Sequence, residues 1–151
     1  MIAKHEVTIT LGGRVVTINL TNIQAIAVED DEGSALLIQA ILRRIGANIS
    51  THPTGERFLD YMHSLPIAPN LILLDINLPR KNGIEILQEL RADPQFKDIL
   101  VIAISSVDPI KYLPILKEAG FDSFLRKPIR REHLPKQIER ILAGEAIWEI
   151  N

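Results

Sequence analysis

Four short apolar stretches of this sequence are each followed or ended by side chains that can bind charged groups. These side chains are Glu29 with Asp30, Asp75, Ser105 and Lys127. Asp75 interrupts an otherwise apolar run at 71–76, and burying a lone carboxylate is costly unless it faces solvent or a cation. Turn-forming residues follow at 77–83, so Asp75 is expected at the end of a strand.

The residue types in this set are those that phosphate chemistry requires. Carboxylates held close together repel one another, and a hard cation such as Mg²⁺ relieves that repulsion by binding their oxygens. A metal ion and the Lys127 ammonium would both neutralise an incoming phosphoryl group, and the Ser105 hydroxyl could hydrogen-bond one of its oxygens. A carboxylate such as Asp75 can itself be the nucleophile and form an aspartyl phosphate.

An alternation of strand and helix patterns would position these side chains. Short apolar runs predict strands at 23–28, 47–51, 71–75, 99–104 and 124–125. Helical spacing predicts helices at 35–45, 54–65, 84–91, 114–119 and 131–142. This alternation favours an α/β fold with a parallel sheet covered by helices on both faces.

The carboxyl ends of parallel strands share one edge of the sheet, where ligands bind in open α/β folds. We therefore expect the four polar sites to converge there. Helix capping alone would explain an Asp or a Ser after a strand, but it explains less well a Lys127 followed by Pro128.

The fourth helix is expected to be short. Pro109 and Pro114 both fall in its pattern, and proline is tolerated in the first turn of a helix but not in its interior. We therefore predict a helix that starts near Pro114, with 108–113 as a loop.

Residues 6–20 predict a β-hairpin ahead of the sheet. Apolar and polar residues alternate there, and Gly12-Gly13 suits a two-residue turn. The turn places four apolar side chains on one face, pairing Val7 with Ile18 and Ile9 with Val16. Either the base of the same domain or a second subunit must cover this face. We favour the second subunit, and hence a homodimer.

We expect a hairpin extension at 1–22, one domain at 23–143 and a tail at 144–151. A chain of 151 residues with 46% hydrophobic residues can form one domain with a real core. A net charge of −2 gives no overall attraction to nucleic acid or membranes. With no cysteine, no secretory signal and no apolar run of transmembrane length, a cytoplasmic protein is expected.

The chain resembles the receiver domains of response regulators in two-component signalling, which are CheY-like, from about 23 to 142. The motifs that carry the resemblance are VED at 28–30, LLDINLPRKNG at 73–83, AIS at 103–105 and FLRKP at 124–128. It implies a flavodoxin-like, doubly wound sheet of five strands in the order 2-1-3-4-5. LPRKNG and Trp148 further resemble stand-alone receivers paired with phytochrome-type kinases, although the Asn-Pro-Gly-Asp often seen after Asp30 is missing.

The resemblance also implies roles for single residues. Asp75 matches the phosphoacceptor, Ser105 the switch hydroxyl, and Lys127 the phosphate-binding lysine, which a cis proline at Pro128 usually follows. Phe124 matches the aromatic switch that turns inward when the hydroxyl moves.

A Mg²⁺ cofactor is implied at the same place. Asp30 matches the acid that ligates the metal directly, and Glu29 its partner, which often acts through water. Asp75 is the third acidic ligand, and the main-chain carbonyl of Asn77 completes the site.

The implied function is that of a stand-alone response regulator phosphorylated by a sensor histidine kinase. No DNA-binding domain follows Leu142, so the signal is expected to pass to a downstream protein or phosphotransfer protein, without direct contact to nucleic acid. Beyond slow self-dephosphorylation, no enzyme activity is expected.

Two alternatives stay open. One is a phosphatase with an aspartyl-phosphate intermediate. Such enzymes typically carry a second Asp two residues after the nucleophile, where this chain has Asn77. The other is a pseudo-receiver that only binds proteins. Such domains commonly lose the acidic pair or the lysine, whereas this chain keeps Glu29, Asp30 and Lys127.

Overall fold

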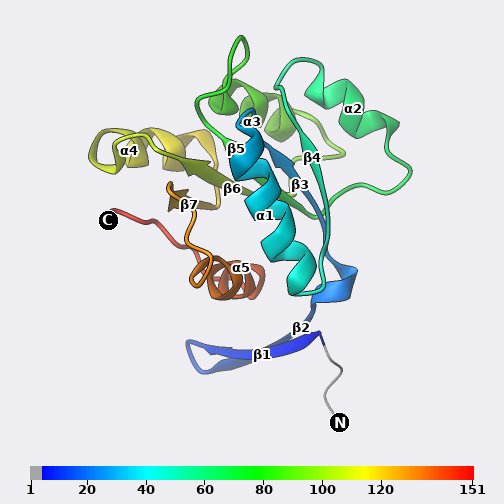
Figure 1. Ribbon diagram of the computed structural model, residues 1–151, viewed down its shortest axis with the longest axis vertical. Coiled ribbons are helices and arrows are strands. Elements are labelled where there is room, and N and C mark those ends of the chain that lie inside the picture. The colour runs from blue at the N-terminus through cyan, green and yellow to red at the C-terminus, as the bar shows by residue number, and fades with distance from the viewer. Residues whose placement is uncertain (1–4) are drawn as a thin grey trace.

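The computed structural model describes residues 5–151, which form two sheets and a set of surrounding helices (Figure 1). The strands are β1 (Glu6–Leu11), β2 (Arg14–Asn19), β3 (Gln24–Val28), β4 (Asn48–His52), β5 (Leu71–Asp75), β6 (Leu100–Ser105) and β7 (Ser123–Arg126). The α-helices are α1 (Glu32–Arg44), α2 (Phe58–Ser64), α3 (Gly83–Ala92), α4 (Pro109–Ala119) and α5 (Leu134–Leu142), and Leu20–Asn22 forms a 3₁₀ turn.

The main sheet is parallel and has five strands in the order β4-β3-β5-β6-β7. Counted from β3, this is the doubly wound order 2-1-3-4-5, so the prediction is confirmed. The register places Asp75 opposite Ile104 and Ser105 opposite Arg126. The carboxyl ends of neighbouring strands therefore lie at one edge of the sheet.

Each face of the sheet has its own hydrophobic core, because successive side chains of a strand point to opposite faces. In β5, Ile72 and Leu74 pack with residues of α2, α3 and α4, whereas Leu71 and Leu73 pack with residues of α1 and α5. All four side chains are at most 1% exposed. This explains why β5 reads as a continuous apolar run: it is covered on both sides.

The prediction that the fourth helix starts near Pro114 is wrong, because α4 spans Pro109–Ala119. Pro109 occupies the first turn, where Asp108 caps the helix by accepting a hydrogen bond from the Ile110 N–H. Pro114 lies inside the helix and cannot donate to the Ile110 carbonyl. Ile110 is 86% exposed, so water can satisfy this carbonyl and the helix continues through the proline.

Two other helices start later than predicted. The chain before α2 makes a turn in which Glu56 N–H donates to Thr54 Oγ1, and Arg57 adopts a positive φ of 56°. α5 begins at Leu134 after turns at 131–133, and Pro135 falls in its first turn, where proline fits.

The predicted hairpin forms, with Val7 opposite Ile18 and Ile9 opposite Val16. Val7 and Ile18 pack against the core beneath α1 and α5, so part of the apolar face is covered by the hairpin's own domain. In Figure 1 the hairpin lies below α5, at the end of the molecule away from α3 and α2. Of the predicted extension at 1–22, residues 1–4 lie outside the described part.

No helix within residues 5–151 has the length and apolar character needed to cross a bilayer.

Candidate functional site

The predicted convergence of polar side chains occurs at the carboxyl edge of the sheet. Glu29 directly follows β3, Asp75 ends β5, Ser105 ends β6 and Lys127 directly follows β7. Three of these residues are nearly inaccessible to solvent, with Glu29 3%, Asp75 5% and Ser105 1% exposed. Polar groups buried to this extent need partners or a ligand.

Three carboxylates form a compact acidic cluster, which we call the acidic triad: Glu29, Asp30 and Asp75. One oxygen from each lies within 4.8 Å of the other two. Asp30 is exposed, while the other two are buried, so the triad opens to solvent on one side. Burial raises the pKa of Glu29, and the charge of nearby Asp75 adds to this effect. A cation bound to the triad would relieve both costs.

Lys127 connects the strands of the site. Its ammonium lies 2.8 Å from Glu29 Oε2 and 3.1 Å from Asp75 Oδ2, and it is 17% exposed. Burial by itself would lower the pKa of Lys127. The hydrogen bonds to the two carboxylates outweigh burial and raise this pKa, so the ammonium stays charged. The direct bond between Lys127 and Glu29 could not be anticipated, because the two are far apart in the sequence.

Ser105 brings a buried hydroxyl to the site. Its Oγ neither donates nor accepts a hydrogen bond among residues 5–151. A buried unpaired hydroxyl is unfavourable, and a ligand oxygen beside Asp75 would satisfy it.

The loop after Asp75 is held close to the site. Asn77 N–H donates to Asp75 Oδ1 at 3.1 Å, and Gly83 N–H donates to the Ile76 carbonyl at 3.0 Å. A Cβ on Gly83 would lie 2.3 Å from the Asp75 carbonyl oxygen, so only glycine lets α3 start this close to the strand. In the sequence Gly83 indicates a turn, but nothing there shows this close approach.

Two further expectations concern β7 and the residue after Lys127. Phe124 is fully buried in β7, three residues before Lys127, and the Lys127–Pro128 peptide bond is cis. Trp148 of the tail forms a parallel bridge with Phe124, a contact that sequence reasoning missed.

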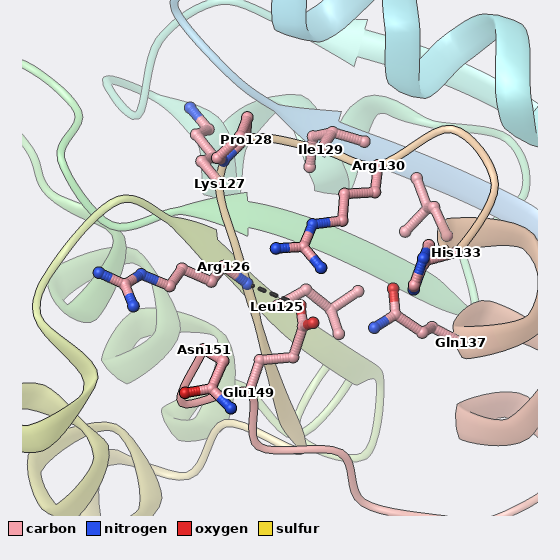
Figure 2. Close-up of a pocket in the computed structure, with 11 residues that line it drawn as sticks. Leu125, Arg126, Lys127, Pro128, Ile129, Arg130, His133, Gln137, Glu149 and Asn151 are labelled. Atoms are coloured by element: carbon pink, nitrogen blue, oxygen red, sulfur yellow. Dashed lines mark hydrogen bonds between the residues drawn. The ribbon is translucent and has the colours of Figure 1, made fainter.

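A pocket of about 260 Å³ lies beside the loop between β7 and α5 (Figure 2). Arg130, His133, Gln137 and Glu149 line it, together with Leu125 and neighbouring residues. Lys127 also lines this pocket, but its ammonium bonds to Glu29 and Asp75. Neither of these two carboxylates lines the pocket. The pocket is therefore separate from the acidic triad.

With this geometry, the chain matches the response regulator receiver domain family over residues 25–139. It therefore belongs to that family. Domains of this family are phosphoacceptor signalling modules that histidine kinases phosphorylate, are generally not enzymes, and bind Mg²⁺ at an acidic pocket.

Curated relatives match most of the chain. CpxR of Escherichia coli, a transcriptional regulatory protein, is 34% identical over 116 residues, which are 76% of this chain and 47% of CpxR. PhoP of Bacillus subtilis is 30% identical over 126 residues, which are 83% of this chain and 51% of PhoP. The regA phosphodiesterase of Dictyostelium discoideum is 28% identical, and the match covers 85% of this chain but 16% of regA. The chain thus spans about half or less of the length of these relatives.

Solved structures with the same fold include CheY4 of Vibrio cholerae, with a TM-score of 0.72, 22% identity and coverage of 79% of this chain and 98% of that one. The phosphorylated cyanobacterial phytochrome response regulator RcpA has a TM-score of 0.69 and 26% identity, and the match covers 79% of this chain and 90% of RcpA. The Mn²⁺-bound response regulator Rcp1 gives 0.68, 25% identity and coverage of 81% and 93%.

Proposed function

We propose that this chain accepts a phosphoryl group on Asp75 from a sensor histidine kinase, in a Mg²⁺-dependent reaction, and signals to a protein partner by a conformational change. The observation that carries this proposal is the buried site itself. A carboxylate at a strand end lies 3.1 Å from a charged Lys127 ammonium and beside two further acids. In this proposal residues 23–143 are the receiver unit, 1–22 an extension and 144–151 a tail.

The acidic triad fits a magnesium ion by the chemistry of its donors. Hard oxygen ligands from two or three carboxylates are what Mg²⁺ binds, with water filling its other positions. Glu29, Asp30 and Asp75 would hold the ion together with the main-chain carbonyl of Asn77. Bound there, Mg²⁺ would neutralise negative charge on the transferred phosphoryl group.

The protein's own groups then account for the transfer. An Asp75 carboxylate oxygen attacks phosphorus, the bond from phosphorus to the imidazole nitrogen of the kinase's phosphohistidine breaks, and that nitrogen keeps the electron pair. The Lys127 ammonium pairs with a phosphoryl oxygen, and the unpartnered Ser105 hydroxyl donates to another. Phe124, the proposed aromatic switch, would respond to the shift of Ser105 from an inward position, because it is already fully buried in this structure.

We also propose that the domain acts through protein contacts, with a downstream target or a phosphotransfer protein, and that the hairpin mediates a homodimer. Val15 of the hairpin is 69% exposed, and β1 and β2 pair with each other but with no other strand among residues 5–151. A strand edge that pairs with no other strand of its own chain can pair with a second copy.

Mass spectrometry can test the phosphoacceptor directly. A small phosphodonor with Mg²⁺ should add a single phosphoryl group to the chain, and Asp75→Asn should abolish it. Asp60→Asn is the matched control, because Asp60 is an exposed residue of α2 paired with Arg57. Labelling that persists in Asp75→Asn would refute the assignment. Repeated turnover of the phosphodonor would favour the phosphatase alternative. The absence of any labelling would favour the pseudo-receiver alternative.

A further inference from the structure

The tail segment (residues 144–151) runs beside β7, the last strand of the main sheet (Figure 1). Phe124 N–H donates to the Ile147 carbonyl at 2.8 Å, and Glu149 N–H donates to the Phe124 carbonyl at 3.0 Å. Phe124 and Trp148 form a parallel bridge. The tail therefore pairs with the edge of β7 as a short additional strand would.

Side chains reinforce this pairing. Ile147 N–H donates to Ser123 Oγ at 3.0 Å, and Arg126 N–H donates to Glu149 Oε1 at 2.9 Å, the bond drawn in Figure 2. Three of the four residues of β7 are thus held through their backbone or side-chain polar groups.

The tail also has the alternation of a strand covered on both faces. Ile147 packs against the core under α1 and α5, whereas Trp148 packs against the core on the opposite face of the sheet. The Lys117 ammonium of α4 lies 5.1 Å from the centre of the Trp148 ring, a cation–π contact. The alternation of Ile147 and Trp148 therefore suits the position that the tail occupies beside β7.

The docking is specific but shallow. Glu149 and Asn151 of the tail line the pocket of about 260 Å³ (Figure 2), so the tail is incompletely packed there. Ile150 is 60% exposed. Only two backbone hydrogen bonds join the tail to β7, and none of the described residues 144–151 is fully buried, whereas the core strands are bonded along their length. Segments of this kind open more readily than the core, so we expect the tail to leave β7 while the rest of the domain stays folded.

The backbone that the tail holds leads directly into the phosphate site. Lys127 follows Arg126, and its N–H donates to the Ser105 carbonyl at 2.9 Å. Ser105 and Arg126 are also opposite each other in the register of β6 and β7. If Ser105 or Lys127 shifted toward a phosphoryl group on Asp75, the neighbouring backbone of Arg126 would move with it. The N–H of Arg126 is the group that donates to Glu149.

We propose that the edge of β7 is a strand-docking site, that the chain's own residues 147–149 occupy it before phosphorylation, and that phosphorylation of Asp75 releases them. The release of the tail by phosphorylation rests on the proposed function. The docking of the tail in the unphosphorylated chain is independent of that function. Because coupling between two equilibria is reciprocal, undocking also favours the phosphorylated conformation.

Docking is tested in the unphosphorylated full chain, in which Trp148 is the only tryptophan. Glu149→Ala removes the acceptor of the Arg126 N–H. It should raise acrylamide quenching of Trp148 by roughly twofold or more, because the tail opens more often. Glu132→Ala, the loss of another exposed acid, is the matched control and should leave quenching unchanged. Equal quenching in both variants and the wild type would overturn the docking site.

Coupling is tested by amide hydrogen exchange in chains whose phosphorylation has been verified by mass. Exchange of the Glu149 and Phe124 amides should accelerate by about tenfold on phosphorylation, whereas the Leu73 amide in the central strand should not change. Phosphorylated chains with unchanged Glu149 exchange would overturn the coupling. A chain that gains no phosphoryl mass refutes the proposed function and, with it, the release of the tail by phosphorylation, while the quenching experiment still decides the docking site.

Discussion

Ser105 carries a buried hydroxyl that has no hydrogen-bond partner among residues 5–151. Ser123, equally buried, instead accepts a hydrogen bond from the Ile147 N–H. Ser105 is the last residue of β6 and Ser123 is the first residue of β7, and only the hydroxyl of Ser123 forms a hydrogen bond within the described chain. This contrast allows a matched test of whether Ser105 serves a ligand.

We predict that Ser105→Ala does not lower the free energy of unfolding, because no hydrogen bond is lost and a buried unpaired hydroxyl is removed. Ser123→Ala should cost about 1 kcal/mol, because the Ile147 N–H loses its acceptor. Urea unfolding measures both. Ser105→Ala should still be phosphorylated, but its amide chemical shifts should change much less on phosphorylation. Identical phosphorylation-induced shifts in wild type and Ser105→Ala would contradict the switch role.

The convergence of the site side chains could be predicted because each is a polar exception at the end of an apolar run, whereas their roles remain a proposal. Asp75 and Ser105 end strands that are buried on both faces, and Lys127 follows a third. Their contacts could not be predicted. Whether the Lys127 ammonium bonds to Glu29, to Asp75 or to both depends on the spacing of β3, β5 and β7, which the sequence does not encode locally.

At the scale of elements, the strands were predictable and some helix ends were not. Continuous apolar runs identify buried strands, whereas the start of a helix depends on a few caps and turns. α4 shows the limit most clearly. The rule that proline ends a helix failed at Pro114, where the residue one turn earlier, Ile110, is 86% exposed and leaves its carbonyl within reach of water; solvent exposure of this kind is not visible in the sequence pattern.

The interior proline makes α4 a testable element. Pro114 is exposed, so Pro114→Ala loses little packing and gains an N–H donor for the Ile110 carbonyl. Replacing an interior proline by alanine favours the helix by about 3 kcal/mol, offset by about 1 kcal/mol from the greater freedom of the unfolded chain. We therefore expect a variant more stable by about 2 kcal/mol in urea unfolding.

Lys111→Ala, at another exposed position of α4, is the control and should change the stability by less than about 0.5 kcal/mol. A Pro114→Ala chain no more stable than the wild type would mean that the proline sits in α4 without cost.

For the whole molecule, the fold keeps three features apart. The proposed phosphate site lies at the carboxyl edge of the sheet, the tail lies along the β7 edge, and the hairpin lies at the opposite end of the molecule. Ile23 connects the 3₁₀ turn to β3, so the hairpin must emerge at the amino end of β3, while Glu29 follows its carboxyl end. Five residues of strand separate the two ends, roughly 17 Å.

The hairpin is therefore expected to affect assembly and not phosphorylation. Deleting residues 1–19 removes both hairpin strands but keeps Leu20, which is 2% exposed and belongs to the core. The truncated chain should accept a phosphoryl group on Asp75 at the wild-type rate. It should also lose some stability, because Val7 and Ile18 no longer cover the base of the domain.

Sedimentation of both chains over a range of concentrations decides the assembly role. If the hairpin mediates the homodimer, the full chain should shift from monomer to dimer with concentration, and the truncated chain should remain a monomer. Val15→Lys in the full chain serves as a milder variant, since Val15 is exposed and its replacement leaves the contacts of Val7 and Ile18 in place. Should the full chain, Val15→Lys and the truncation all sediment alike, the hairpin covers only its own domain. The free edges of β1 and β2 would then have no role in self-association.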